Sequence, residues 1–178
     1  MPAIFLLAAL AFGGIFTWAA LKKRPGVGTP AASALAVIGD SLAVGLTPYL
    51  SAWAQSRGLA FVQDAKVGRF TRQQGTEAVP VNGLVFVSLG TNDATAAVDG
   101  SALRAFAQAL RARGPRAIVW LLPPATKALP GLDAVRATIQ SLGVIVVQTA
   151  APLRADGLHP ASYAQTFQDV LPGLAPMG

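Results

Sequence analysis

The chain has 178 residues, 53% of them hydrophobic, and a formal net charge of +6. It contains no cysteine, which excludes disulfides and thiolate metal sites, and its single histidine excludes a histidine-rich metal site. Lys22, Lys23 and Arg24 supply three of the charges, and the mild excess of the remaining 11 basic over 8 acidic residues does not indicate nucleic-acid binding. We expect no metal, no cofactor and no nucleic-acid partner.

The first 22 residues are interpreted as a membrane segment. Residues 3–21 carry no charge and would rise about 28 Å as a helix, close to the roughly 30 Å hydrocarbon core of a bilayer. A secretory signal usually has basic residues before its apolar run, whereas here they follow it. We therefore favour a retained single-pass transmembrane anchor, or uncleaved signal, at 1–22 over a cleaved signal. A Pro-, Gly- and Ala-rich linker at 23–34 and a folded domain at 35–178 follow.

Five short apolar runs predict buried strands. They are residues 35–38, 59–65, 84–89, 117–122 and 144–147. Stretches with helical periodicity alternate with them, at 41–57, 73–78, 101–113, 132–142 and 161–171. This alternation predicts a three-layer α/β/α sandwich with a five-stranded parallel sheet covered on both faces, preceded by one transmembrane helix.

Single residues refine these predicted helices. Pro48 is expected to interrupt or kink the first helix, because proline removes a backbone hydrogen bond. Asp99 or Ser101 is expected to cap the helix at 101–113. Tyr163 and Phe167 are expected to face inward from the last helix.

Polar motifs follow four of the five predicted strands directly. Ser41 follows the first strand, Gly68 the second and Asn92 the third. Asp156 and His159 follow the fifth. Because open α/β sheets bind their ligands outside the carboxyl ends of the strands, these residues are expected to meet at one edge of the sheet.

The four motifs resemble the sequence blocks of the SGNH, or GDSL, hydrolase superfamily. Gly39–Leu42 (Gly-Asp-Ser-Leu) is similar to the nucleophile block, and Gly68 lies where the second block places a glycine. Gly90–Asp93 resembles the Gly-x-Asn-Asp block, and Asp156–Pro160 contains the Asp-x-x-His pattern. The similarity extends over about residues 35–171 and implies a flavodoxin-like SGNH fold and a serine hydrolase.

The resemblance implies a role for each residue. Ser41 would be the nucleophile and His159, the only imidazole in the chain, its base, because a serine hydroxyl needs a proton acceptor to attack an ester. Asp156 would orient the imidazole and stabilise its protonated form. The backbone N–H groups of Ser41 and Gly68 and the side-chain amide of Asn92 would form the oxyanion hole.

Each motif alone has an ordinary structural interpretation. Ser41 would serve as a helix N-cap, Asn92 and Asp93 as an Asx turn, and Asp156 and His159 as a loop carboxylate and a surface imidazole. Their order and their placement after strands favour the functional interpretation.

Two local patterns bear on the substrate. Residues 64–69 resemble SGNH domains linked to O-acetyl transfer and removal on cell-wall polysaccharides, whereas residues 121–124 are more similar to general esterases. We expect a membrane-anchored serine esterase that acts on small acyl esters of a glycan or lipid-like substrate, O-acetyl groups on glycans among them. An O-acyltransferase with the same acyl-enzyme, and a catalytically silent membrane-anchored structural or binding protein, stay open as alternatives.

The side of the membrane and the oligomeric state stay open as well. The positive-inside rule places residues 22–24, and with them the domain, in the cytoplasm. The resemblance implies instead a periplasmic or extracellular domain. Nothing in the sequence selects an oligomeric state.

Overall fold

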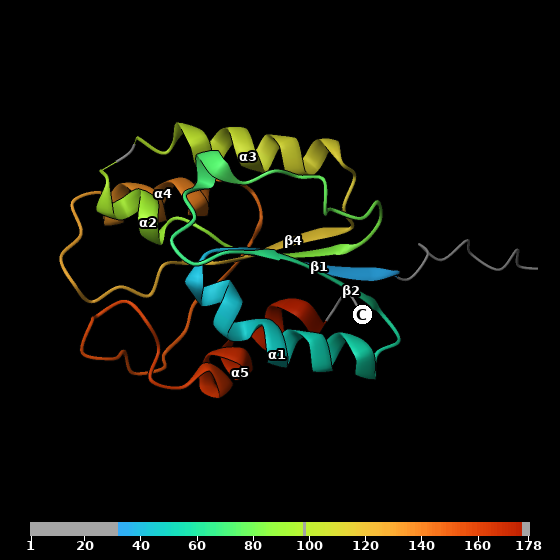
Figure 1. The fold of residues 1–178 in the computed structure, drawn as a ribbon. Coiled ribbons are helices and arrows are strands. Elements are labelled where there is room, and N and C mark those ends of the chain that lie inside the picture. The colour runs from blue at the N-terminus through green and yellow to red at the C-terminus, as the bar shows by residue number, and fades with distance from the viewer. Residues whose placement is uncertain (1–31, 98, 176–178) are drawn as a thin grey trace, which may run out of the picture. The chain divides into compact units, whose positions relative to one another are not determined.

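Five parallel strands form one sheet in the computed structural model, which describes residues 32–97 and 99–175 (Figure 1). The strands are β1 (Ala34–Gly39), β2 (Ala60–Ala65), β3 (Leu84–Ser88), β4 (Ala117–Leu121) and β5 (Ile145–Val147). They lie in the order β2-β1-β3-β4-β5. The predicted five-stranded parallel sheet is confirmed, with strand bounds within two residues of those expected.

Helices cover both faces of this sheet. They are α1 (Ser41–Ser56), α2 (Thr91–Thr95), α3 (Ser101–Ala112), α4 (Leu132–Ser141) and α5 (Tyr163–Leu174), with one 3-10 turn, η1 (Thr71–Gln73). Figure 1 shows α1 and α5 on one side of the sheet and α2, α3 and α4 on the other. The predicted three-layer α/β/α sandwich is confirmed.

The central strands supply the core on both faces. In β3, Leu84 and Phe86 pack in the cluster under α1 and α5, while Val85 and Val87 pack in the cluster under α3 and α4. This alternation follows from the two-residue period of a strand. Burying each such side chain contributes about 1.5–3 kcal/mol before entropy is counted, so the central strands anchor the fold.

The two edge strands correct the prediction that all five strands are buried. None of the six residues of β2 is buried, since three are exposed and three half-buried, and its sequence carries Gln63 and Asp64. β5 begins with the exposed Ile145 and buries only Val147. Each edge strand has a single neighbour in the sheet, so one of its sides meets water.

The predicted helix at 73–78 is wrong. This segment contains only the end of the 3-10 turn η1 and then continues as loop. The backbone N–H of Thr71, the first residue of this turn, donates to the carboxylate of Asp93 at 3.1 Å. The short helix α2 takes the place of the Asx turn that was the alternative at Asn92 and Asp93.

The other local expectations are largely confirmed. α1 runs as one helix through Pro48, although Figure 1 shows it changing direction along its length. The expected cap of α3 at Asp99 or Ser101 is wrong: Gly100 is the N-cap, and Asp99, one residue before it, accepts the N–H of Ser101 at 2.8 Å. Tyr163 and Phe167 pack half-buried against the cluster under α1 and α5.

The anchor expected at 1–22 and most of the linker at 23–34 lie outside the described residues. None of the helices formed by residues 32–97 and 99–175 has both the length and the apolar run that crossing a bilayer requires.

We predict that Gly39→Ala destabilises the fold strongly. A Cβ at Gly39, whose φ is +155°, would lie 2.2 Å from the backbone oxygen of Ser88, an atom that cannot move without parting β1 from β3. The free energy of unfolding should fall by about 3 kcal/mol or more, which urea titration followed by tryptophan fluorescence would measure. Gly58→Ala is the control, since a Cβ there meets open space and should cost only about 1–2 kcal/mol of backbone strain. Equal losses in both variants would contradict the close contact.

Candidate active site

The strand order creates a switch point between β1 and β3. From there the sheet continues toward β2 on one side and toward β4 and β5 on the other, which opens a crevice at the carboxyl ends of the two strands. Ser41 begins α1 directly beyond β1, and Asn92 lies in α2 beyond β3. Two of the predicted site residues therefore flank the place where this sheet order forms a ligand site.

The structure brings Ser41, His159 and Asp156 together in one hydrogen-bonded chain. Nε2 of His159 lies 2.8 Å from Oγ of Ser41, and Nδ1 lies 2.8 Å from Oδ2 of Asp156. Asp156 and His159 belong to the loop between β5 and α5, so the chain joins segments 118 residues apart. With a proton on Nδ1 donated to Asp156, Nε2 is free to accept the proton of Ser41.

The Asp156–His159 loop is held by its own hydrogen bonds. Oδ1 of Asp156 accepts the backbone N–H groups of Leu158 at 2.8 Å and His159 at 3.0 Å. The N–H of Arg154 donates to the carbonyl of His159 at 2.7 Å and closes the loop. The two backbone N–H groups, and after them the imidazole, lower the pKa of Asp156 well below its usual range. The lowered pKa favours the ionised carboxylate that the imidazole needs as its partner.

The hydroxyl of Ser41 is not used as a helix cap. Asp40 is the N-cap of α1, and its Oδ1 accepts the N–H of Leu42 at 3.0 Å. The structural interpretation of Ser41 as an N-cap is therefore wrong. Its Oγ is left to hydrogen-bond with His159.

Asp40 also fastens the β1–α1 junction to β3. Its backbone N–H donates to the carbonyl of Ser88 at 2.9 Å, and the Ser88 hydroxyl donates back to Oδ1 at 3.3 Å. The carboxyl is fully buried, and Oδ2 has no hydrogen-bond partner among the described residues. Burial raises the pKa of Asp40 to about 6, although the N–H of Leu42 and the hydroxyl of Ser88 act in the opposite direction. The sequence assigned Asp40 no role, and the preference of aspartate for N-caps was the available signal.

The three predicted oxyanion donors come from segments that are bonded to one another. Asn92 donates one amide hydrogen to the carbonyl of Arg69 at 3.0 Å, which leaves its second amide hydrogen available. The N–H of Lys66 donates to the carbonyl of Gly39 at 2.9 Å, so the loop that carries Gly68 is held between the end of β1 and α2. The backbone N–H groups of Ser41 and Gly68 donate no hydrogen bond within the described residues. Their roles as oxyanion donors, like the catalytic roles of the triad, stay predictions.

Gly68 has a backbone reason to be glycine. Its φ of +76° lies in the left-handed region that residues with a side chain avoid. A Cβ there would meet no atom within 4 Å, so the backbone borders open space. The conformation thus presents the main chain of this loop to solvent or to a ligand.

Two residues that the sequence reasoning missed hold this loop in place. The buried carboxylate of Asp93 accepts the backbone N–H of Thr71 at 3.1 Å and its hydroxyl at 2.8 Å. Nη1 of Arg69 bonds Oδ1 of Asp64 at 2.7 Å and its carbonyl at 2.8 Å. Asp93 belongs to the quoted Gly-x-Asn-Asp pattern and Arg69 to the stretch 64–69 quoted for its resemblance, but the sequence assigned neither residue a role.

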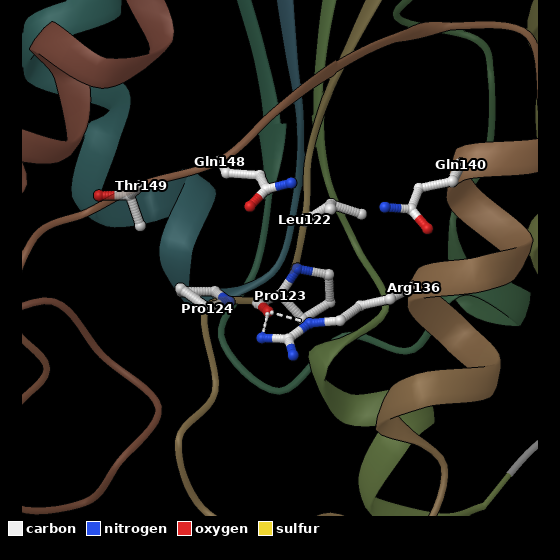
Figure 2. Close-up of a pocket in the computed structure, with 7 residues that line it drawn as sticks. All are labelled: Leu122, Pro123, Pro124, Arg136, Gln140, Gln148 and Thr149. Carbon is white, nitrogen blue, oxygen red and sulfur yellow. Dashed lines mark hydrogen bonds between the residues drawn. The ribbon is translucent and has the colours of Figure 1, made fainter.

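Two pockets open at this edge of the sheet. The first, of about 370 Å³, borders the glycine loop and is lined by Lys66, Val67, Gly68, Arg69 and Gln73. The second, of about 300 Å³, lies at the ends of β4 and β5 (Figure 2). There Arg136 donates to the carbonyl of Pro123, with Gln140 and Gln148 on either side of Leu122. Only the first pocket contains a predicted site residue.

The site is open to water. The side chains of His159 and Asp156 are 30% and 44% exposed. Within the described residues, no three histidine, aspartate or glutamate side chains are grouped as metal ligands. The arrangement is suited to removing the proton of Ser41 and passing it to a leaving group or taking it from a water molecule.

Comparison with known proteins supports this fold. No protein-family model and no curated protein sequence matches the chain. Several solved structures, in contrast, match its fold. LAE5, an α/β hydrolase enzyme from the metagenome of Lake Arreo in Spain, superposes with a TM-score of 0.58 at 18% identity, over 84% of this chain and 98% of that one.

Two further structures are similar to the same extent. A catalytic mutant of Axe2, an acetylxylan esterase from Geobacillus stearothermophilus, has a TM-score of 0.57 at 14% identity, over 82% of this chain and 95% of its own. A member of the lipolytic protein G-D-S-L family from Veillonella parvula has a TM-score of 0.57 at 15% identity, over 80% of this chain and 96% of its own. The α/β fold is thus shared with hydrolases that include GDSL-type enzymes.

We predict that Asp40→Asn changes the pH dependence of stability. The pKa of about 6 in the folded protein exceeds the ordinary 3.8, so the folded state binds the extra proton between these values. The free energy of unfolding of the wild type therefore loses a contribution as the pH rises from about 4 through 6. The asparagine variant keeps an acceptor at Oδ1 and has no charge to bury. Its free energy of unfolding should therefore increase relative to that of the wild type as the pH rises, by up to about 3 kcal/mol above pH 7. Urea titrations of both proteins from pH 4.5 to about 8 would measure the difference, and a difference that is constant with pH would contradict it.

Proposed function

We propose that the protein is a serine esterase that hydrolyses small acyl esters through an acyl-serine intermediate. The observation that carries the proposal is the Ser41–His159–Asp156 chain of two 2.8 Å hydrogen bonds at the switch point of the sheet. The match of the fold to hydrolase structures supports it.

In the acylation step, Oγ of Ser41 attacks the ester carbonyl carbon while its proton passes to Nε2 of His159. The imidazolium is stabilised by the ionised Asp156, to which Nδ1 is bonded. The tetrahedral intermediate then expels the alcohol, which takes the proton from Nε2 as the carbon–oxygen bond breaks. The products of this step are a free alcohol and the Ser41 ester.

The carbonyl oxygen becomes negatively charged in the intermediate. The unpaired N–H groups of Ser41 and Gly68 and the second amide hydrogen of Asn92 are the donors proposed to stabilise it. They need little reorganisation during the reaction, because their segments are already fastened to β1 and α2 by the bonds of Lys66 and Arg69.

The deacylation step mirrors the first. A water molecule attacks the acyl-serine, His159 takes its proton, and the acid leaves as the proton returns to Ser41. The exposure of His159 and Asp156 gives water direct access. This favours hydrolysis over transfer to a second acceptor, the alternative that shares the same acyl-enzyme.

We infer a hydroxyl-rich substrate for this site, with O-acetyl groups on a glycan as the leading class. The pocket beside Gly68 is lined by polar and charged side chains, Lys66, Arg69 and Gln73 among them, which suits sugar hydroxyls better than a long acyl chain. An acetylxylan esterase shares the fold. Attachment to a membrane through residues 1–22 belongs to the same proposal and rests on the sequence.

Labelling with a fluorophosphonate probe tests the nucleophile without knowledge of the substrate. We expect the wild type to be labelled at Ser41, because the probe reacts with a serine that an adjacent base activates. Ser41→Ala should remove both the label and the hydrolysis of an aryl acetate, with circular dichroism confirming that the variant is folded. Ser51→Ala, on the same helix, should retain both. Unchanged labelling of Ser41→Ala would overturn the mechanism.

Asn92→Ala should lower kcat for an aryl acetate by about 100- to 1,000-fold, the usual effect of losing one oxyanion donor, with a smaller change in KM. The same substitution also releases the carbonyl of Arg69, so Thr71→Val serves as the control. It loosens the same loop by removing the bond from the Thr71 hydroxyl to Asp93 while leaving the amide of Asn92 in place. Equal losses in both variants would mean that Asn92 acts only by holding the loop.

A further inference from the structure

Basic side chains gather at the edge of the sheet opposite the candidate site. α1 and α3 run antiparallel to the strands, so their last turns lie where the strands begin (Figure 1). Arg57 follows α1, Arg111 and Arg113 end α3, and Arg116 precedes β4. We call these four arginines the basic edge.

The side-chain carboxylates lie elsewhere. Six of the eight lie at the site edge, near the end of a strand, after one or at the start of a helix, namely Asp40, Asp64, Asp93, Asp99, Asp133 and Asp156. Asp169 bonds Thr149 beyond the end of β5, and Glu77 borders a pocket with residues of α3 from Ala102 to Ala109. None of the eight belongs to the strand-start edge, and among the described residues no side-chain carboxylate forms an ion pair with Arg57, Arg111 or Arg113.

Aliphatic side chains protrude among these arginines. Val81 is 71% exposed, and its loop is tied to the arginine segment by bonds from Asn82 to Gly114 and from Arg116 to Gly83. Ile145, at the start of β5, is 37% exposed.

A pocket of about 480 Å³ opens at the same edge. Its lining combines the guanidinium-bearing Arg111 and Arg116 with the apolar Ile118, Val144 and Ile145. Arg111 is oriented by a hydrogen bond to the carbonyl of Leu142. A cationic rim above an apolar wall matches an amphiphile with an anionic head.

We propose that the basic edge docks on the anionic phospholipid headgroups of a bilayer. Guanidinium groups bind phosphate through paired hydrogen bonds, and exposed aliphatic residues between them enter the boundary between headgroups and acyl chains. A nucleic acid would be attracted by the arginines and would leave Val81 and Ile145 without a role.

The course of the chain adds a second reason. β1 begins at this edge with Ala34, and only nine residues separate it from the basic cluster 22–24 that follows the uncharged run 3–21. A bilayer that holds that run would therefore lie within a short linker's reach of the basic edge.

This docking also orients the candidate site. β1 and β3, of six and five residues, span about 17–20 Å, and Ser41, with His159 bonded to it, and Asn92 lie beyond their far ends. A domain seated on its basic edge would turn these residues away from the lipid, toward esters carried by a polymer or a soluble molecule.

Fluorescence quenching of single-cysteine variants tests the docking, since the natural chain contains no cysteine to interfere. Val81→Cys and Val67→Cys are a matched pair, because these valines are 71% and 69% exposed on opposite edges. Each full-length variant is labelled with a small fluorophore and combined with bilayers of phosphatidylcholine alone or mixed with phosphatidylglycerol, both containing a headgroup-attached quencher. We expect several-fold stronger quenching at position 81 than at 67, and only in the anionic bilayers.

Removing positive charges tests whether the arginines cause the quenching at position 81. Arg57→Gln, Arg113→Gln and Arg116→Gln together should reduce quenching at position 81 toward the level at 67, since each basic residue near an anionic surface contributes about fivefold to the attraction. Arg72→Gln, Arg104→Gln and Lys127→Gln together remove the same charge from the site edge and should leave it unchanged. The proposal would be overturned by equal quenching at both positions, or by quenching that does not depend on lipid charge or on the arginines. Failure of the chain to associate with anionic bilayers would also overturn it. The readout requires no turnover, so it is independent of the esterase assignment.

Discussion

The contact between the ends of β1 and β3 is the constraint on which the candidate site depends. Gly39 pairs with Ser88 so closely that a Cβ would collide with its carbonyl, and Asp40 then bonds the same residue in both directions. This brings the start of α1 against the strand that leads to α2. Ser41 and Asn92, 51 positions apart, therefore follow adjacent strands at the same edge of the sheet.

Buried polar bonds extend this constraint to the remaining parts of the site. Lys66 attaches the glycine loop to β1, and Asp93 attaches the following turn to α2 through Thr71. Such bonds matter most where water is excluded, because an unpaired buried polar group is costly there. Asp40 is the one exception among the described residues, with an unpartnered buried Oδ2 beside the nucleophile. A raised pKa there is the physical consequence, since protonation relieves the burial of charge.

Sequence reasoning predicted the strands and the members of the site well, because apolar runs such as 84–89 are local signals and parallel strands end at one edge. It failed where the outcome depends on distant partners. The turn that precedes the loop 73–78 is held by Asp93, 22 residues further along the chain, and β2 and β5 are exposed because of their places in the sheet. The distance between His159 and Ser41 depends on a loop closed by the bond from Arg154 to the His159 carbonyl, which no local pattern indicated.

The separation of charge between the two edges follows in part from the electrostatics of helix ends. Helix C-termini carry partial negative charge, so arginines at the ends of α1 and α3 are stabilising there, and Asp99 and Asp133 are favourable at the opposite helix ends. This accounts for the positions of Arg57 and Arg111. It does not account for Val81, which belongs to no helix and is largely exposed beside them. The proposed docking would cover this side chain and pair with the arginines at once, because an anionic lipid surface offers phosphates to the cations and an apolar boundary to the valine.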